Sequence, residues 1–305
     1  MLRRPQASGF SATHEEYREA RETKPVLVFV HEGVELEPDQ AAFAEEVRNW
    51  SGGAFTAGFQ TPDDLRREVT RALHRFDVTE ARTRAADPQR GLQEARELVG
   101  SEAPNWQEAR LVLAIAPVAP QSVLRPTELE DERLHRDLKQ AVLFGEWALF
   151  DAALGVRSRV DGDRLVLEQD HASVSLGATG SIRIALPAYS EDARRGMSAV
   201  IEEEVFAVVQ RAMSFASWLL ARVDPTHRVS DVVPVVALQG TGYAPWRTRA
   251  EHAASPSAMT MRNSDREVTV ELSPPARRRA ALEHQTRELA EDFTVLLRRQ
   301  VRSER

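Results

Sequence analysis

Hydrophobic and polar positions at the start of the chain follow the pattern of helices that alternate with strands. An uninterrupted apolar run at residues 26–30 is typical of a strand that is covered on both faces. Residues 14–21 before it and residues 38–50 after it carry apolar positions at helical spacing, and residues 55–59 alternate like a second strand. Thr61, followed by a proline, then caps a third helix. The order of these elements predicts a parallel α/β segment.

The pattern changes between residues 77 and 105, where the chain becomes polar and rich in alanine, arginine and glutamate. Prolines and glycines interrupt this stretch and leave room for one short helix at residues 92–99. We therefore predict three parts: a first domain over residues 1–76, a helical linker over residues 77–105 and a second domain over residues 106–305.

The second domain mixes both kinds of pattern, which predicts an α+β fold with long helices. Asp161-Gly162 between two alternating runs is a strong hairpin signal, and the short strands around it predict a β-meander. Strands are predicted at residues 110–116, 156–160, 164–169, 172–176, 182–186, 232–238 and 267–272. Helices are predicted at residues 128–153, at residues 201–223 and from residue 276 onward.

Composition narrows the class of protein. The 305 residues are 42% apolar, which is enough for two buried cores, and no apolar run approaches the length of a membrane span. The net charge of −7 argues against nucleic-acid binding, because phosphate contacts need clustered cations. The absence of cysteine excludes disulfides and thiolate metal sites and suits a reducing compartment. We therefore expect a cytoplasmic protein that does not contact membranes.

Motifs for the common chemistries are missing from the sequence. It contains no Walker lysine loop, no GxGxxG after a strand, no HExxH and no GxSxG. Its eight histidines never pair three or four residues apart on one predicted helix. We therefore expect no metal site and no cofactor.

One stretch near the N-terminus carries a more specific pattern. Residues 11–20 read SATHEEYREA and lead into KPVLVFV at residues 24–30. The pattern continues through EPDQAAF at residues 37–43 and TPDDL at residues 61–65 to His74. About a quarter of the chain thus resembles the family catalogued as domain of unknown function 4062, which is similar to TIR domains and nucleoside deoxyribosyltransferases.

The resemblance implies a partial TIR-like, flavodoxin-like sheet and suggests a role for Glu16. In those relatives a glutamate on the helix before a strand works at a ribose and helps to cleave an N-glycosidic bond, so a nucleotide such as NAD is a candidate ligand. A carboxylate can stabilise the oxocarbenium-like charge of that reaction. The alternative interpretation is structural, because Thr13 and Glu16 have the spacing of a capping box at the start of a helix.

The domain that the resemblance implies would be N-terminally truncated. Domains of that kind place most of their fold before this glutamate, whereas here ten residues precede the motif. The apolar strand at residues 26–30 would then have an edge that needs covering by a partner protein, by self-association, by the second domain or by residues encoded before an incorrectly assigned start. The favoured hypothesis is a non-catalytic regulatory or interaction protein of bacterial signalling or defence type. The alternative is an N-glycosidic hydrolase or transferase acting on NAD or a nucleotide, with Glu16 as catalytic carboxylate and the missing half supplied.

A second candidate site lies in the loop that follows the strand at residues 232–238. Arg247, Arg249 and His252 stand there close to two aromatic residues, and arginine forks suit a phosphate or carboxylate ligand. The alternative interpretation is an anchored surface turn in which Trp246 packs on the core.

Overall fold

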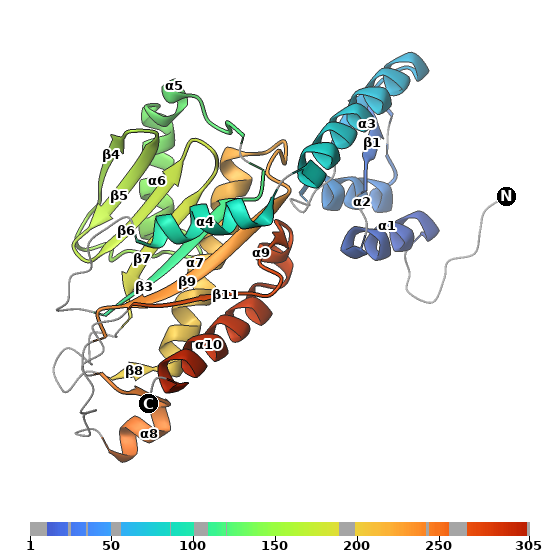
Figure 1. Ribbon diagram of the computed structural model, residues 1–305. Coiled ribbons are helices and arrows are strands. Elements are labelled where there is room, and N and C mark those ends of the chain that lie inside the picture. Colours follow the sequence, from blue (N-terminus) through green and yellow to red (C-terminus); the bar gives the residue numbers. More distant parts are fainter. Residues whose placement is uncertain are drawn as a thin grey trace. The chain divides into compact units, whose positions relative to one another are not determined.

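The chain is described here by a computed structural model that covers residues 11–23, 26–34, 36–49, 56–85, 87–100, 109–119, 121–188, 199–241, 244–255 and 267–303 (Figure 1). It divides into two compact units, Met1–Arg84 and Ala85–Arg305. The first unit contains a small parallel sheet, and the second contains a larger antiparallel sheet with long helices. The predicted α/β class is therefore confirmed.

The first unit alternates helices with strands, as its hydrophobic pattern predicts. Its elements are α1 (Ala12–Thr23), β1 (Val28–His31), α2 (Pro38–Asn49), β2 (Thr56–Phe59) and α3 (Pro62–Ala85). The strands β1 and β2 pair in parallel with Val28 opposite Thr56. The hydroxyl of Thr61 accepts a hydrogen bond from the amide of Asp64 at 3.1 Å, while the Asp64 carboxylate accepts one from the Thr61 amide at 3.0 Å. This reciprocal cap fixes the start of α3 where the sequence predicts it.

The second unit is built on an eight-stranded sheet with the order β11-β9-β3-β7-β6-β5-β4, in which β12 also pairs with β9. Every pair of neighbouring strands is antiparallel. The strands are β3 (Arg110–Pro117), β4 (Arg157–Asp161), β5 (Arg164–Gln169), β6 (Ala172–Gly177), β7 (Ile182–Pro187), β9 (Asp231–Gln239), β11 (Val268–Glu271) and β12 (Arg277–Arg278). A separate parallel pair is formed by β8 (Val200–Ile201) and β10 (Trp246–Arg247).

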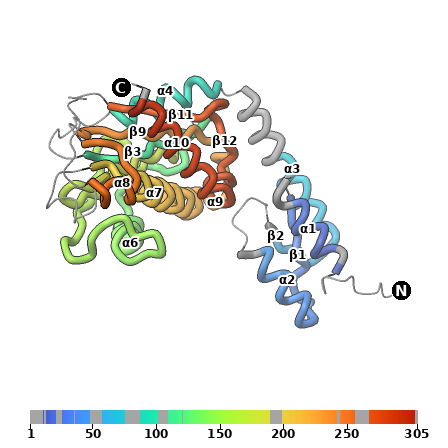
Figure 2. Tube along the Cα trace, turned by 90° about the horizontal axis from the view of Figure 1, so that it is seen from below, coloured from blue at the N-terminus to red at the C-terminus, as the bar shows by residue number. Residues whose placement is uncertain are grey.

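Helices cover both faces of this sheet. Figure 2 shows α4 on one side of β3 and β9, with α6 and α7 on the other. The helices of the unit are α4 (Pro88–Val99), α5 (Pro126–Leu129), α6 (Glu132–Phe144), α7 (Glu202–Val223), α8 (Arg249–Ala254), α9 (Ala281–His284) and α10 (Thr286–Ser303). None of the helices in the described part of the chain has the length and apolar character needed to cross a membrane.

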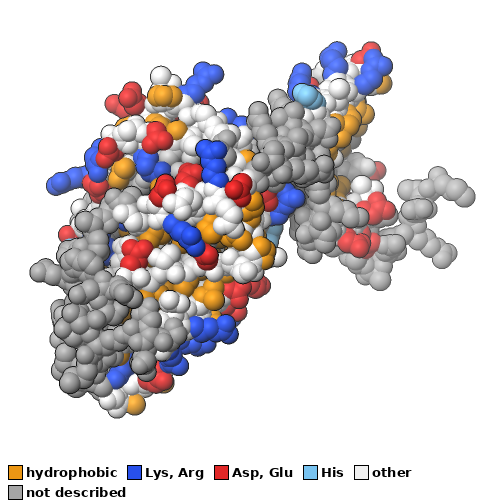
Figure 3. Space-filling view, viewed as in Figure 1, with side chains coloured by type: hydrophobic (Ala, Val, Ile, Leu, Met, Phe, Trp, Pro, Cys, Tyr) orange, Lys and Arg blue, Asp and Glu red, His pale blue; other side chains and the backbone are white. Residues whose placement is uncertain are grey.

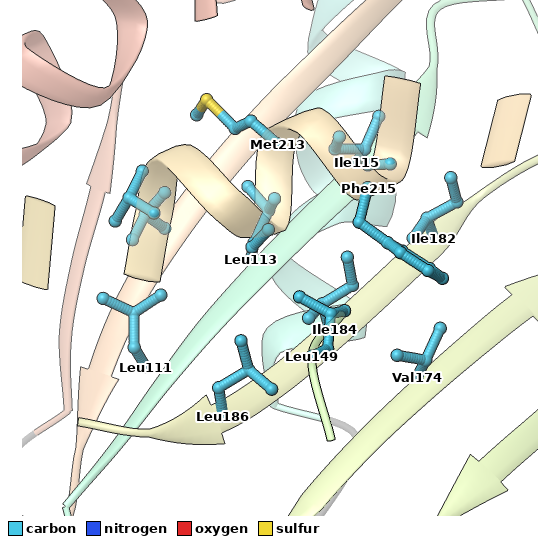
Figure 4. Packing of buried hydrophobic residues seen from close by; sticks show 14 of the residues in the cluster. Leu111, Leu113, Ile115, Leu149, Val174, Ile182, Ile184, Leu186, Met213 and Phe215 are labelled. Atoms are coloured by element: carbon cyan, nitrogen blue, oxygen red, sulfur yellow. The ribbon is translucent and has the colours of Figure 1, made fainter. Parts of the chain in front are cut away.

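The two central strands β3 and β9 explain the longest apolar runs of the second unit. Alternate residues of β3 point to opposite faces, so Leu111, Leu113 and Ile115 lie on the face that α7 covers, and Phe215 of α7 points towards the sheet there (Figure 4). The intervening residues of β3 and β9 lie under α4, and these are mostly alanine and valine. Small side chains on that face let α4 approach the sheet closely, because little volume separates the helix from the strands.

The helix at residues 88–99 therefore has a different role from the one that the sequence predicts. Its polar surroundings in sequence predict a linker, but Leu92, Ala95 and Val99 are buried against the sheet of the second unit. The boundary between the two units falls after Arg84, within the last turn of α3. The composition of this stretch, rich in alanine and charged residues, is typical of a linker. It could not show that the apolar face of the helix packs on a sheet whose strands are distant in sequence.

Two helix boundaries of the second domain also differ from prediction. The helix predicted over residues 128–153 ends at Phe144, and α5 is separate from α6. Gly145 follows the last residue of α6 with an extended backbone, and glycine fits there because a Cβ atom would lie 2.7 Å from the carbonyl oxygen of Ala141. Asp131 caps the start of α6 by accepting a hydrogen bond from the Arg133 amide at 2.8 Å. The closing helix, predicted from residue 276 onward, is α10, which begins at Thr286 after β12 and the short α9.

Candidate functional site

Glu16, the candidate catalytic residue, lies on the exposed surface of α1. The predicted capping box is wrong, because α1 begins at Ala12 and places Thr13 inside the helix. Ser11 takes the capping role, and its hydroxyl accepts a hydrogen bond from the His14 amide at 3.3 Å. Glu16 makes no hydrogen bond or ion pair with any residue that the structure describes.

The carboxylate that organises the first unit is Glu46 on α2. It accepts two hydrogen bonds from the guanidinium of Arg18, at 3.0 and 2.8 Å, and lies 2.7 Å from His14 Nε2. The His14 ring also stacks on Phe43, with 4.4 Å between the ring centroids. The hydrogen bonds from Arg18 lower the pKa of Glu46 to about 2. This cluster fastens α1 to α2, and sequence reasoning missed it because its members come from two different helices.

The predicted ligand residues Arg247, Arg249 and His252 lie on β10 and α8, where Arg247 has a protein acceptor and the Arg249 side chain is 71% exposed. The guanidinium of Arg247 donates to the carbonyl oxygen of Ser255. The backbone amide of Arg249 donates to Glu203 Oε2 at 2.9 Å, and its guanidinium lies 3.9 Å from a carboxylate oxygen of Glu204. His252 Nδ1 is buried and has no hydrogen-bond partner among the described residues.

The start of α7 accounts for the anchoring of this loop. Trp246 is 2% exposed, and its indole Nε1 donates to Glu202 Oε2 at 2.8 Å. The other oxygen of Glu202 accepts a hydrogen bond from Arg298 of α10 at 2.7 Å. The acidic run at the start of α7 is stabilised by the helix dipole and by these cations. The contacts therefore match an anchored turn around Trp246.

A hollow of about 520 Å³ lies at one end of the large sheet. We call it the Arg211 hollow. Its walls come from the loop after α6, the β5–β6 turn, the end of β7 and the face of α7 that carries Ala207, Val208 and Arg211. A more polar hollow of about 580 Å³ adjoins it across Leu154 and the β5–β6 turn.

Arg211 is the one arginine that lines this hollow, and its surroundings lower its pKa. Much of the Arg211 side chain is exposed, yet removal of water from around its guanidinium lowers its pKa. No nearby carboxylate contributes to that shift. Sequence reasoning missed the site, because its walls come from four separate segments and no local motif marks them.

A buried polar cluster joins the end of α7 to the segment before α9. The side chain of Asp224 is fully buried and accepts hydrogen bonds from the Val229 amide at 2.9 Å and from Arg279 at 3.0 Å. His227 lies beside this pair with a φ of 51°. Burial, and then the positive charge of Arg279, lower the pKa of His227 to about 4. The cluster holds the turn after α7 against the segment that carries Arg279.

A second polar cluster lies on the face of the sheet that α4 covers. The guanidinium of Arg164 donates to Ser175 Oγ at 2.6 Å and to Ser181 Oγ at 2.9 Å. Burial lowers the pKa of Arg164 and raises the pKa of Glu94 on α4, although the charge of Arg164 opposes the shift at Glu94. Each group therefore has an internal partner, which makes the cluster structural.

Charged side chains are interspersed over the face of the second unit that Figure 3 draws, with neither sign gathered into a broad patch. The described residues contain no group of three side chains placed to hold a metal ion. Comparisons of the chain with known protein families, with characterised proteins and with solved structures find no match.

Proposed function

We propose that the chain is a non-catalytic regulatory or interaction protein of bacterial signalling or defence type, acting in the cytoplasm, whose first unit is a surface for self-association. The observation that carries this proposal is the position of Glu16. The carboxylate is exposed on α1 and contacts no oriented polar group among the described residues.

Catalysis at a ribose needs more than a carboxylate. The group must be held at a fixed distance from the scissile bond, and further donors must stabilise the charge that develops there. Two polar side chains of α1, His14 and Arg18, contact Glu46 on α2. These polar contacts join α1 to α2 and do not surround Glu16. This favours an interaction role over N-glycosidic cleavage.

Apolar residues at the end of β1 supply a surface for assembly. Val28, Phe29 and Val30 are only partly buried, and within the described residues β1 pairs with β2 alone. Val34 and Leu36 follow the strand and are 53% and 36% exposed. Two-stranded sheets seldom bury enough surface for stability, so covering this region with a second copy of the chain would stabilise the unit.

Light scattering coupled to size exclusion tests the proposal on the full chain. We expect the protein to elute as a dimer or larger at micromolar concentration, and the double variant Val34→Asp, Leu36→Asp to elute as a monomer. Phe144→Asp is the matched control, because Phe144 is 68% exposed but belongs to the second unit. That variant should keep the assembly.

Turnover of NAD, followed by release of nicotinamide, separates the interaction role from the enzymatic one. We expect the chain and Glu16→Ala to release nicotinamide at the same background rate, as should Glu19→Ala, which changes another exposed glutamate of α1. A monomeric wild-type chain would remove the assembly role. Turnover that disappears in Glu16→Ala and persists in Glu19→Ala would establish N-glycosidic cleavage instead.

A further inference from the structure

We propose that the Arg211 hollow of the second unit binds an organic anion: a small molecule with an apolar body that fills the hollow and a carboxylate, sulfonate or phosphate group that Arg211 holds. This inference does not depend on the role of the first unit.

The size and lining of the hollow suit a small molecule. Its volume of about 520 Å³ lies within the range of about 300 to 1,000 Å³ that is usual for ligand pockets. Leu149 and Phe150 line it from the loop after α6, Pro187 and Ala188 from the end of β7, and Val208 from α7. An apolar ligand body would therefore meet apolar side chains on three sides.

Arg211 is the polar group at this site that still needs a partner. Its guanidinium makes no hydrogen bond or ion pair with the residues that the structure describes, and burial alone lowers its pKa. Arg211 lines the hollow while much of its side chain stays exposed, so an anion in the hollow would replace water at the guanidinium with charge-assisted hydrogen bonds.

The carboxylates around the hollow already have donors. Glu204 lies 3.9 Å from the guanidinium of Arg249, and Asp170 lies 3.1 Å from His171 Nε2. Asp151 accepts a hydrogen bond from the Ala153 amide at 2.8 Å. Among the described residues none of these three carboxylates is paired with Arg211, so its guanidinium is available to a ligand.

Hydrogen bonds within the protein fix the walls of the hollow in the absence of a ligand. Gln169 is 8% exposed; its side chain accepts from the Asp151 amide at 2.7 Å and donates to the Asp151 carbonyl oxygen at 2.7 Å. It also donates to the carbonyl oxygen of Gly155, which ties the loop after α6 to the β5–β6 turn. Ala207, Val208 and Arg211 project from one face of a long helix, because they are three and four residues apart. A site with fixed walls loses little entropy on binding.

A pair of fluorescent probes tests the inference on the full chain. 8-Anilinonaphthalene-1-sulfonate carries an anionic group, and N-phenyl-1-naphthylamine has nearly the same apolar body without it. We expect Arg211→Gln to weaken binding of the sulfonate by about tenfold or more, since a hydrogen bond to a charged group is lost. Binding of the neutral probe should change by less than about twofold, because its apolar contacts remain.

Three further variants make the result specific. Arg222→Gln removes an exposed arginine that lies three turns along the same face of α7 and pairs with Asp137, and it should leave both probes unaffected. Ala207→Trp fills the hollow and should abolish the site for both probes. Arg211→Lys keeps the charge without the planar fork, and its sulfonate affinity should lie between those of the wild type and Arg211→Gln.

The inference fails if the wild-type chain binds no sulfonate probe at millimolar concentration, or if Ala207→Trp binds it as well as the wild type. It also fails if Arg211→Gln loses both probes equally, because the arginine would then be only part of the wall. Thermal melting of each variant identifies any that does not fold. If Arg211→Gln does not fold, the sulfonate affinity of Arg211→Lys decides, and an affinity equal to that of the wild type would contradict the inference.

Discussion

Asp224 and Arg279 form an ion pair that is almost completely removed from solvent. Arg279 Nη1 lies 3.0 Å from Asp224 Oδ2, with side-chain exposures of 9% and 0%. The same nitrogen donates to the backbone carbonyl oxygen of Asp224 at 3.1 Å. The pair therefore ties the end of α7 to the chain between β12 and α9, two segments that are distant in sequence.

Replacing one partner of this pair should destabilise the second unit strongly. We expect Arg279→Gln to lower the free energy of unfolding by about 2 to 3 kcal/mol, because it removes the buried counter-ion of Asp224 and leaves the half-exposed Arg228, 3.3 Å away, as the remaining one. Arg278→Gln is the control, because that arginine is 63% exposed and pairs with Asp231 at 3.3 Å. Its loss should cost less than about 1 kcal/mol. Urea unfolding followed by tryptophan fluorescence measures both, and equal losses would contradict the role of the buried pair.

His227 should make stability depend on pH in the acid range. Its pKa in the folded chain is about 4, against 6.5 when unperturbed, so the unfolded chain binds more protons between these values. Stability from neutral His227 is complete above pH 6.5 and declines as the pH falls towards 4. The whole effect amounts to about 3 kcal/mol.

Asparagine at position 227 is the variant that isolates this effect, because it tolerates the positive φ. The free energy of unfolding of His227→Asn should vary less with pH over this range than that of the wild type. His284→Asn, which changes an exposed histidine on α9, should keep the wild-type dependence. An unchanged pH dependence in His227→Asn would show that other groups cause it.

The Glu46 cluster should control the local stability of the first unit. The folded pKa of about 2 means that the carboxylate stabilises the fold above its ordinary pKa of 4.5 and loses this effect as the pH falls towards 2. Arg18 is 41% exposed, which weakens the pair, so we expect Glu46→Ala to cost about 1 to 2 kcal/mol at neutral pH. Hydrogen exchange of the α1 amides should accelerate accordingly. Glu19→Ala, on the outer surface of α1, should leave the exchange rates unchanged.

Local patterns predicted most of the elements of this fold. The end of α7 at Val223 and the strands of the β4–β7 meander follow from hydrophobic period and turn residues, which act over a few positions. The sheet order could not be derived this way, because β3 pairs with β7 and β9, and no local signal specifies which strands meet. The assignment of α4 to a linker failed for the same reason.

The candidate sites depended even more on distant contacts. Residue types alone suggested a ligand for Arg247 and Arg249; Arg247 donates to the Ser255 carbonyl oxygen, the Arg249 side chain is 71% exposed, and the ligand stays a prediction. Arg211 carries no distinctive motif, and its surroundings consist of segments from four places in the chain. The role of Glu16 came from resemblance and stays a prediction, which the nicotinamide assay tests.

Gly177 marks a close approach in the polar cluster under α4. A Cβ atom at this position would lie 2.5 Å from Ser181 Oγ and 2.7 Å from a guanidinium nitrogen of Arg164. Gly177→Ala should therefore displace Arg164 from its hydrogen bonds and cost about 1 to 3 kcal/mol. Gly100→Ala is the control, because the nearest atom would be 3.9 Å away and its φ is negative. Thermal melting should separate the two variants, and a neutral Gly177→Ala would mean that the cluster relaxes freely.

The last prediction concerns which segment completes the second unit. Because α4 covers the face of β3 and β9 opposite α7, a fragment of residues 85–305 should fold alone and melt cooperatively. A fragment of residues 106–305, the domain that the sequence analysis delimits, lacks this helix. Val112, Val233 and Val235 would then face water, together with the alanines beside them.

Loss of α4 should cost on the order of 5 kcal/mol, because its buried apolar side chains and the sheet surface beneath them each lose their cover. Circular dichroism melting and light scattering of the two fragments measure this difference. Adding a peptide of residues 85–105 to the shorter fragment should restore part of its stability, and the same peptide with Leu92→Asp should not, because Leu92 is buried against the sheet. If residues 106–305 melt at the same temperature as residues 85–305, then α4 contributes little, and the boundary after residue 105 describes the folding unit correctly.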